Sequence, residues 1–182
     1  MEFDYFTELL YIIGMDMIVV LHNIRSIYNV GAIIRTAEGM GVGKVIFSGY
    51  TPRIHDERLL PHLREKINRE IHKTALGAED MINAEYSDDI VVDLKRLKSL
   101  GWGVVGLENN IQVNKIIPLN SMGLKEVLAD KIVLFLGEEV DGINPMFYDL
   151  IDCFVEIPMR GQKESFNVSV AAGIAMYGIM YS

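Results

Sequence analysis

The sequence has a single cysteine, Cys153. One cysteine excludes an internal disulfide, which favours a reducing compartment such as the cytoplasm. Three of the four histidines, His55, His62 and His72, lie in one charged segment without a cysteine. Because no cysteine and histidine cluster has the spacing of metal ligands, we expect neither a disulfide framework nor a metal site.

Long hydrophobic runs are also missing. The longest apolar run, Val170 to Tyr181, is shorter than the roughly 20 residues that cross a bilayer. Glu2 and Asp4 stand where a secretory signal would be positively charged. We therefore expect no membrane segment and no signal peptide, and predict a cytoplasmic protein.

Positive charge is scarce. The chain has 17 Lys and Arg against 25 Asp and Glu, a net charge of -8, which argues against binding to a nucleic-acid backbone. The segment Arg53 to Lys73 is locally basic, and it is either a solvated, salt-bridged helix or a binding surface. Its cations are Arg53, Arg58, Arg64, Lys66, Arg69 and Lys73, and its carboxylates are Asp56, Glu57, Glu65 and Glu70.

Short apolar runs alternate with helical patterns, which predicts an α/β fold with a mainly parallel sheet and helices on both faces. The runs are apolar throughout, as in strands covered on both faces. The expected strands are Met17–Leu21, Lys44–Ser48, Gly103–Leu107, Lys131–Leu136 and Cys153–Ile157. The expected helices are Val30–Met40, Glu57–Lys73, Asp88–Leu100, Asn144–Ile151 and Val168–Tyr181, with a short one at Asp4–Ile13. We expect one domain, residues 17–182, after an extension, residues 1–16.

A glycine-containing helix follows the first expected strand. Asn29 is a candidate N-cap, because its side chain can accept a hydrogen bond from a free amide of the first turn. Arg35 lies away from the apolar stripe of this helix, beside Gly31, Ala32 and Gly39. A guanidinium among small residues is either a solvent-facing side chain or a group that holds a phosphate or a developing oxyanion.

Two further clusters follow later strands. Glycines in Leu136 to Gly142 would let a ligand approach the backbone at the carboxyl end of a strand, with Glu139 bracing the loop or facing a cation. The alternative is an ordinary acidic turn. Ser165 and Asn167 lie at the start of the final helix, where they can cap it or reach a ligand. That helix is apolar all round, so we expect burial on every side, in the core or in a dimer.

The three clusters together resemble the motifs of the SpoU (TrmH-like) branch of the SPOUT methyltransferases. The first motif is N-x-R-S-x-x-N-V-G-A-I-x-R-T-A, from Asn23 to Ala37. The second is L-G-x-E-x-x-G, from Leu136 to Gly142, and the third is I-P-M-x-G followed by S-x-N-V-S-V-A-A. The resemblance covers Met17 to Tyr181 and implies a C-terminal trefoil knot, an exception among protein folds, and a homodimer formed through the C-terminal helix.

The resemblance further implies methyl transfer from S-adenosylmethionine to a ribose 2′-hydroxyl of tRNA or rRNA. By motif position, the cofactor contacts Leu107, Gly137, Ile157, Met159 and Phe166. The catalytic or supporting residues are Asn29, Arg35, Glu139, Ser165 and Asn167. The sequence departs from the family at Glu138, often Asn, at Phe166, often Leu, and at Gly173, often Ala.

Two roles are open for Arg35. Family accounts make this arginine the general base, helped by an RNA phosphate. A guanidinium is hard to deprotonate, so it can instead orient the phosphate and stabilise alkoxide charge while a phosphate oxygen or water takes the proton. Two other functions stay open: a knotted RNA-binding protein without methyltransferase activity, and a nucleotide-binding enzyme that acts on a small molecule.

Overall fold

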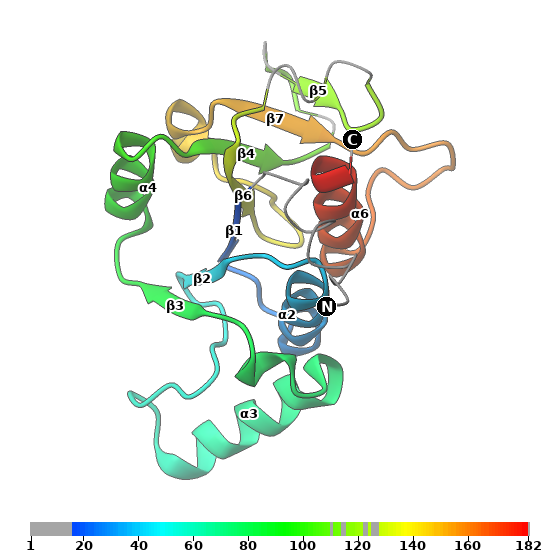
Figure 1. The fold of residues 1–182 in the computed structure, drawn as a ribbon. Coiled ribbons are helices and arrows are strands. Elements are labelled where there is room, and N and C mark those ends of the chain that lie inside the picture. Colours follow the sequence, from blue (N-terminus) through cyan, green and yellow to red (C-terminus); the bar gives the residue numbers. More distant parts are fainter. Residues whose placement is uncertain (1–15, 110, 114–115, 122–123, 125–127, 182) are drawn as a thin grey trace, which may run out of the picture.

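The computed structural model describes residues 16–109, 111–113, 116–121, 124 and 128–181. The helix expected at Asp4–Ile13 lies outside these residues. Seven parallel strands form one sheet in the order β3-β2-β1-β6-β4-β7-β5 (Figure 1). The α/β class with a parallel sheet is therefore confirmed, while the trefoil knot stays a prediction. The strands are β1 (Asp16–His22), β2 (Lys44–Ser48), β3 (Ala84–Ser87), β4 (Gly103–Leu107), β5 (Ile116–Pro118), β6 (Lys131–Leu136) and β7 (Cys153–Glu156).

All five expected strands are present, and β3 and β5 are additional. Both additional strands lie at the edges of the sheet, are short, and are not fully buried. They therefore lack the continuous apolar run that marks the central strands. Among the described residues, the helices are α2 (Ile27–Gly39), α3 (Pro61–Ala75), α4 (Ile90–Ser99) and α6 (Val168–Tyr181), with short 3₁₀ helices η1 (Ala78–Asp80) and η2 (Pro145–Leu150).

Three expected helix positions were wrong in detail. Ser26, not Asn29, caps α2, because the Ser26 side chain accepts a bond from the backbone N–H of Asn29. α3 begins at Pro61 rather than Glu57, and proline suits the first helical position because it lacks an N–H. The segment Asn144–Ile151 forms the 3₁₀ helix η2 instead of an α-helix.

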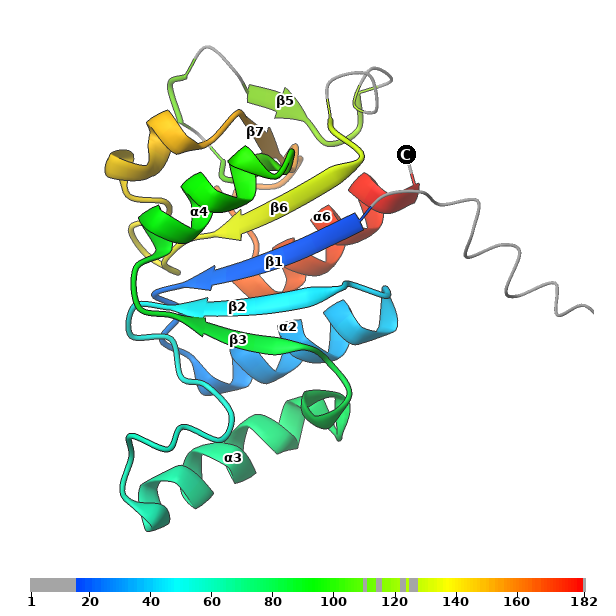
Figure 2. The ribbon, with the colours of Figure 1, turned by 60° about the vertical axis from the view of Figure 1, so that its left-hand side comes forward.

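Two apolar layers bury the sheet. α2 and α6 cover one face, where Val19 and Leu134 belong to the larger core cluster. α4 and η2 cover the other face, with Val20 and Phe135 in the second cluster. α3 packs on α2 rather than on the sheet, so it is the outermost helix in both views (Figures 1 and 2).

α6 is apolar but only partly buried in the single chain. Ala172, Ala175 and Met176 are fully buried, whereas other side chains of the helix remain exposed. The expectation that the helix is buried on every side is therefore not met within one chain. The exposed side chains are Val170, Ile174, Tyr177 and Tyr181. In the described part of the chain, no helix combines the length and the hydrophobicity that a membrane crossing requires.

Gly31 sets the distance between α2 and α3. A Cβ atom at this position would lie 2.4 Å from the carbonyl oxygen of Ile71 and 2.2 Å from the Thr74 hydroxyl oxygen. Gly31 is therefore buried beneath α3, although the sequence placed it with Arg35 on the side of the helix away from the apolar stripe. The glycine is needed for helix packing, because the carbonyl of Ile71 belongs to the α3 backbone.

We predict that Gly31→Ala destabilises the protein although alanine is the better helix former. The methyl group would be forced against backbone, which costs about 1–3 kcal/mol in overpacked sites and outweighs a helix-propensity gain of about 1 kcal/mol. Urea unfolding followed by circular dichroism measures the free energy of unfolding. Gly39→Ala is the control, because a Cβ there meets nothing within 4 Å. Equal stability of Gly31→Ala and wild type would contradict this packing role.

Candidate active site

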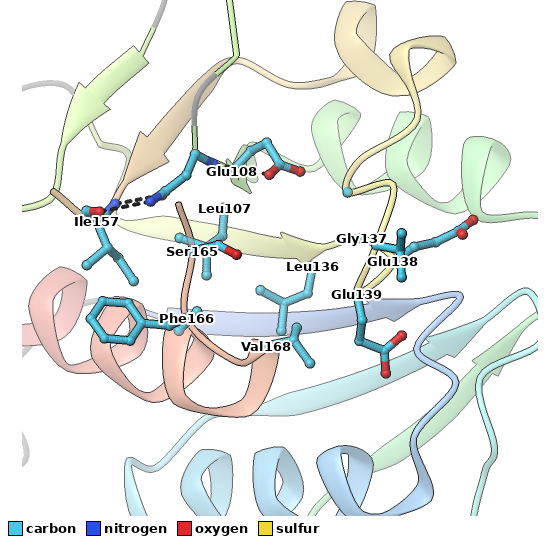
Figure 3. A pocket seen from close by; sticks show the side chains of 14 residues that line it. Leu107, Glu108, Leu136, Gly137, Glu138, Glu139, Ile157, Ser165, Phe166 and Val168 are labelled. Carbon is cyan, nitrogen blue, oxygen red and sulfur yellow. Dashed lines mark hydrogen bonds between the residues drawn. The ribbon is translucent and has the colours of Figure 1, made fainter. Parts of the chain in front are cut away.

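The loops after β4, β6 and β7 form a cleft at the carboxyl edge of the sheet. The cleft has a cavity volume of about 120 Å³ and is open to solvent on one side. This edge is where open parallel sheets bind ligands. The lining residues drawn in Figure 3 are Leu107, Glu108, Asn109, Leu136, Gly137, Glu138, Glu139, Val140, Gly142, Ile157, Ser165, Phe166, Val168 and Ala171.

A hydrogen-bonded chain of three side chains joins the three sequence clusters beside this cleft. The Nδ2 of Asn29 donates to Oε1 of Glu139 at 3.4 Å. The Nδ2 of Asn167 donates to Oδ1 of Asn29 at 3.2 Å. The Oδ1 of Asn167 accepts from the backbone N–H of Ser169, which fixes the orientation of the Asn167 amide at the start of α6. Residues more than a hundred positions apart therefore form one polar network.

Glu139 anchors this network to the start of α2. Its two carboxylate oxygens accept the backbone N–H groups of Arg25 and Ser26, each at 3.0 Å. Burial raises the pKa of Glu139, but the N–H donors of Ser26 and Arg25 outweigh it, so the net pKa is lowered. Figure 3 shows the side chain pointing from the β6 loop toward α2. The first alternative for Glu139, a brace for the loop, agrees with these contacts.

Glu108 holds the same loop from the other side, and the sequence analysis missed it. Its Oε2 accepts the backbone N–H of Ile143 at 2.8 Å. Gly142 has a φ of +68°, and a Cβ there would lie 2.1 Å from the Glu108 carboxylate. A Cβ on Gly137 would lie 2.5 Å from the backbone of Gly142. These glycines let the loop close on itself, whereas the sequence analysis had attributed them to ligand approach.

Asn109 connects the loop after β4 to the loop after β7. Its Nδ2 donates to the carbonyl oxygen of Ile157 at 2.9 Å, and its Oδ1 accepts the N–H of Ile157 at 3.0 Å. The sequence could have pointed to Glu108 and Asn109, because they directly follow an expected strand and the carboxyl ends of parallel strands share one edge of the sheet.

The structure brings most of the expected site residues together. Leu107, Gly137, Ile157, Phe166 and Ser165 line the main cleft. Asn29, Glu139, Phe166 and Asn167 line an adjoining hollow, together with Arg25, Ser26 and Val168. Met159 is half-buried and lines neither space.

Arg35 lies apart from this group. It follows Asn29 by six residues on α2, so it is about 9 Å further along the axis and roughly 120° around the helix. Its side chain is exposed, and it lines neither the cleft nor the adjoining hollow. A single chain therefore does not place the guanidinium with Asn29, Glu139 and Asn167.

A parallel sheet with a polar network and a cleft at its carboxyl edge is the arrangement in which α/β proteins bind ligands. Residues 16–177 match the model of the SpoU rRNA Methylase family. The chain therefore belongs to this family.

Comparison with individual proteins agrees with this membership. The chain is 30% identical over 164 residues to a 23S rRNA (guanosine-2′-O-)-methyltransferase, RlmB, of Xylella fastidiosa, covering 90% of this chain and 58% of that protein. It thus spans less than two thirds of that relative. An AdoMet-bound rRNA methyltransferase from Sinorhizobium meliloti superposes with a TM-score of 0.70 at 21% identity, over 90% of this chain and 55% of that one. The A. aeolicus TrmH/SpoU tRNA modifying enzyme superposes with a TM-score of 0.69 at 22% identity, over 96% and 82%.

We predict a pH-dependent stability contribution from Glu139. Its lowered pKa means that the stabilisation is complete above the ordinary glutamate pKa of about 4.3 and is lost as pH falls through the folded-state value. Glu139→Gln should therefore reduce the free energy of unfolding at pH 7, and its difference from wild type should narrow below about pH 4.5.

Urea unfolding at pH 7, 5.5, 4.5 and 3.5 measures this difference. Glu57→Gln is the matched control, because Glu57 is exposed and its replacement reports the general effect of removing one carboxylate. A difference between wild type and Glu139→Gln that stays constant across these pH values would rule out the charged hydrogen bonds as its source.

Proposed function

We propose that the protein is an S-adenosylmethionine-dependent methyltransferase that acts on a ribose 2′-hydroxyl of tRNA or rRNA. The observation that carries the proposal is the network of Asn29, Glu139 and Asn167, which joins all three motifs in the hollow beside the cleft. The RlmB relative is a methyltransferase of guanosine 2′-O in 23S rRNA. The Sinorhizobium structure has AdoMet bound.

The chemistry of the cleft fits this cofactor. Leu107, Leu136, Ile157 and Phe166 supply apolar surface for a flat base. Glu108 and Glu138 supply negative charge near a cationic ligand. S-Adenosylmethionine, when bound, supplies a methyl group on a positively charged sulfur. We propose that these cleft residues, with Gly137, hold it.

The remaining residues position the ribose. We propose that Ser165, at the rim of the cleft, and the amide of Asn167 orient the sugar and its phosphate, since positioning supplies much of the rate of an in-line displacement. The carboxylate of Glu139 keeps Asn29 and Asn167 in place through the contacts described above. The proposed task of Arg35 is to bind the RNA phosphate and stabilise the developing alkoxide, because its own deprotonation is costly.

The position of Arg35 leads to a proposal about the assembly. Arg35 lines neither the cleft nor the adjoining hollow of its own chain, so its proposed task requires a second protomer. The exposed apolar face of α6 offers the contact surface, with Tyr177 59% exposed. α6 packs directly on α2, where Gly173 faces Thr36. We propose a homodimer formed through α6, in which Arg35 of one protomer serves the cleft of its partner.

Methyl transfer from radiolabelled cofactor to unmodified 23S rRNA and tRNA transcripts tests the function. We expect Arg35→Ala and Asn167→Ala each to lower kcat/KM by at least about tenfold, the loss expected when a transition-state contact is removed. Nucleoside mass spectrometry should identify the product as a 2′-O-methylated nucleoside. Calorimetry that detects no cofactor binding would instead favour an RNA-binding protein without catalysis.

Mixing the two inactive variants distinguishes action within one chain from action across the dimer. If Arg35 acts on the partner's cleft, subunit exchange should restore about one quarter of wild-type activity, because half of the dimers are mixed and each has one intact site. If mixing restores no activity while mass measurement confirms exchange, Arg35 does not act in the partner's site.

The dimer itself is tested by light scattering coupled to gel filtration. We expect a mass of about twice the 20.5 kDa chain for wild type. Ile174→Glu should yield monomers, because it places a charge in the centre of the apolar face. Val92→Glu is the control, since Val92 is exposed on α4 across the sheet. A monomeric wild type, or an unaffected Ile174→Glu dimer, would contradict this interface.

A further inference from the structure

The outermost helix carries a row of basic side chains that the proposed chemistry does not use. His62, Lys66, Arg69 and Lys73 of α3 are spaced by four, three and four residues, and all are exposed. On a helix with 3.6 residues per turn, they lie within about 60° of one another. We name these four residues the α3 stripe. We propose that the α3 stripe binds the phosphate backbone of the RNA substrate.

The structure separates the α3 stripe from the two arginines that precede α3. Arg53 and Arg58 both bind the carboxylate of Asp56, at 2.7 and 3.0 Å. Their guanidinium groups also lie 4.1 and 4.3 Å from the centre of the Tyr86 ring. Hydrogen bonds from Arg58 and Arg53 hold the pKa of Asp56 well below its usual range. These two arginines are therefore committed to the fold of the loop before α3.

Two cations of the α3 stripe differ from Arg53 and Arg58 in this respect. Across residues 16–109 and the later described ranges, the side chains of Lys66 and Arg69 have no hydrogen-bond or ion-pair partner. Lys73 is paired with Glu70 at 2.7 Å, and Glu70 also accepts the Tyr28 hydroxyl. The phosphate-binding capacity of the stripe therefore depends mainly on Lys66 and Arg69.

α3 is held in a fixed position relative to the candidate active site. Thr74 donates its hydroxyl to the carbonyl oxygen of Tyr28 at 3.0 Å, and Tyr28 precedes Asn29 in the chain. Gly31 packs against Ile71 and Thr74 without room for a side chain. The stripe lies on the face of α3 opposite these contacts, so a strand of RNA on it would be held at a fixed distance from the helix that carries Asn29 and Arg35.

A polyanion with regularly spaced charges suits this surface better than a membrane does. A membrane-bound amphipathic helix inserts its apolar face, but Ile71 and Ala75 of α3 are buried in the core, which leaves Leu63 as the exposed large apolar side chain of the helix. The four stripe residues extend over about 16 Å of helix, which is several phosphate spacings along a nucleic-acid strand. The chain's net charge of -8 would repel RNA from most other surfaces, so the stripe would also select the docking orientation.

The inference rests on the proposed function for its choice of RNA as the polyanion. It is tested with Lys66→Gln/Arg69→Gln in the full chain. Lys95→Gln/Arg96→Gln is the matched control, because it removes the same charge from exposed positions on α4, across the sheet. Thermal unfolding of all three proteins verifies that the fold is unchanged. The probes are unmodified transcripts of 23S rRNA and tRNA, with binding measured by filter retention from 0.05 to 0.3 M salt.

We expect the stripe variant to bind the better probe about tenfold more weakly at 0.1 M salt and to lower the slope of log Kd against log salt by about 1–2, with the control unchanged. Its KM for RNA should rise while kcat stays near wild type, because phosphate contacts act on binding. Equal salt slopes for the stripe variant and wild type would overturn the inference, even if the protein is found to methylate RNA. A wild type that binds RNA through the stripe but transfers no methyl group would refute the proposed function alone.

Discussion

The site depends on one carboxylate that accepts hydrogen bonds from two parts of the chain. Glu139, in the loop after β6, accepts two backbone N–H groups just before α2 and the side-chain amide of Asn29. Its charge satisfies amide groups that otherwise lack partners at the start of the helix. These three hydrogen bonds connect the loop beside the cleft to the start of α2. The position of Asn167 depends on the same carboxylate through Asn29.

Much of the fold followed from the sequence because the central strands are buried on both faces. A buried parallel strand requires an unbroken apolar run, and β1, β2, β4, β6 and β7 all have one. β3 and β5 could not be predicted in this way, because an edge strand packs on fewer neighbours and tolerates residues such as Glu85 and Pro118. The start of α2 was misplaced because both Ser26 and Asn29 are residues that cap helices.

The site residues that belong to the three motifs were predictable from the sequence. The residues whose role depends on tertiary packing were not. The motif positions gave Gly137, Ile157, Ser165 and Phe166, which line the cleft. The role of Gly31 was not predictable, because it depends on α3, which lies some forty residues later in the chain. Glu108 was missed because a lone acidic residue after a strand does not reveal that its carboxylate accepts the N–H of Ile143. For Arg35, the spacing of apolar residues along α2 predicted that the side chain points away from the core, but it could not show which group the guanidinium contacts.

The two hydrogen bonds between Asn109 and Ile157 have a consequence for the sheet. A side-chain amide carries the same donor and acceptor as a peptide group, and here it takes the place that the main chain of β4 would occupy beside the chain that leaves β7. The ladder between the two strands therefore gains one more rung, made by a side chain. The backbone of Glu108 and Asn109 no longer has strand geometry. The side chain of Asn109 nevertheless keeps this part of the chain in register with the segment that follows β7.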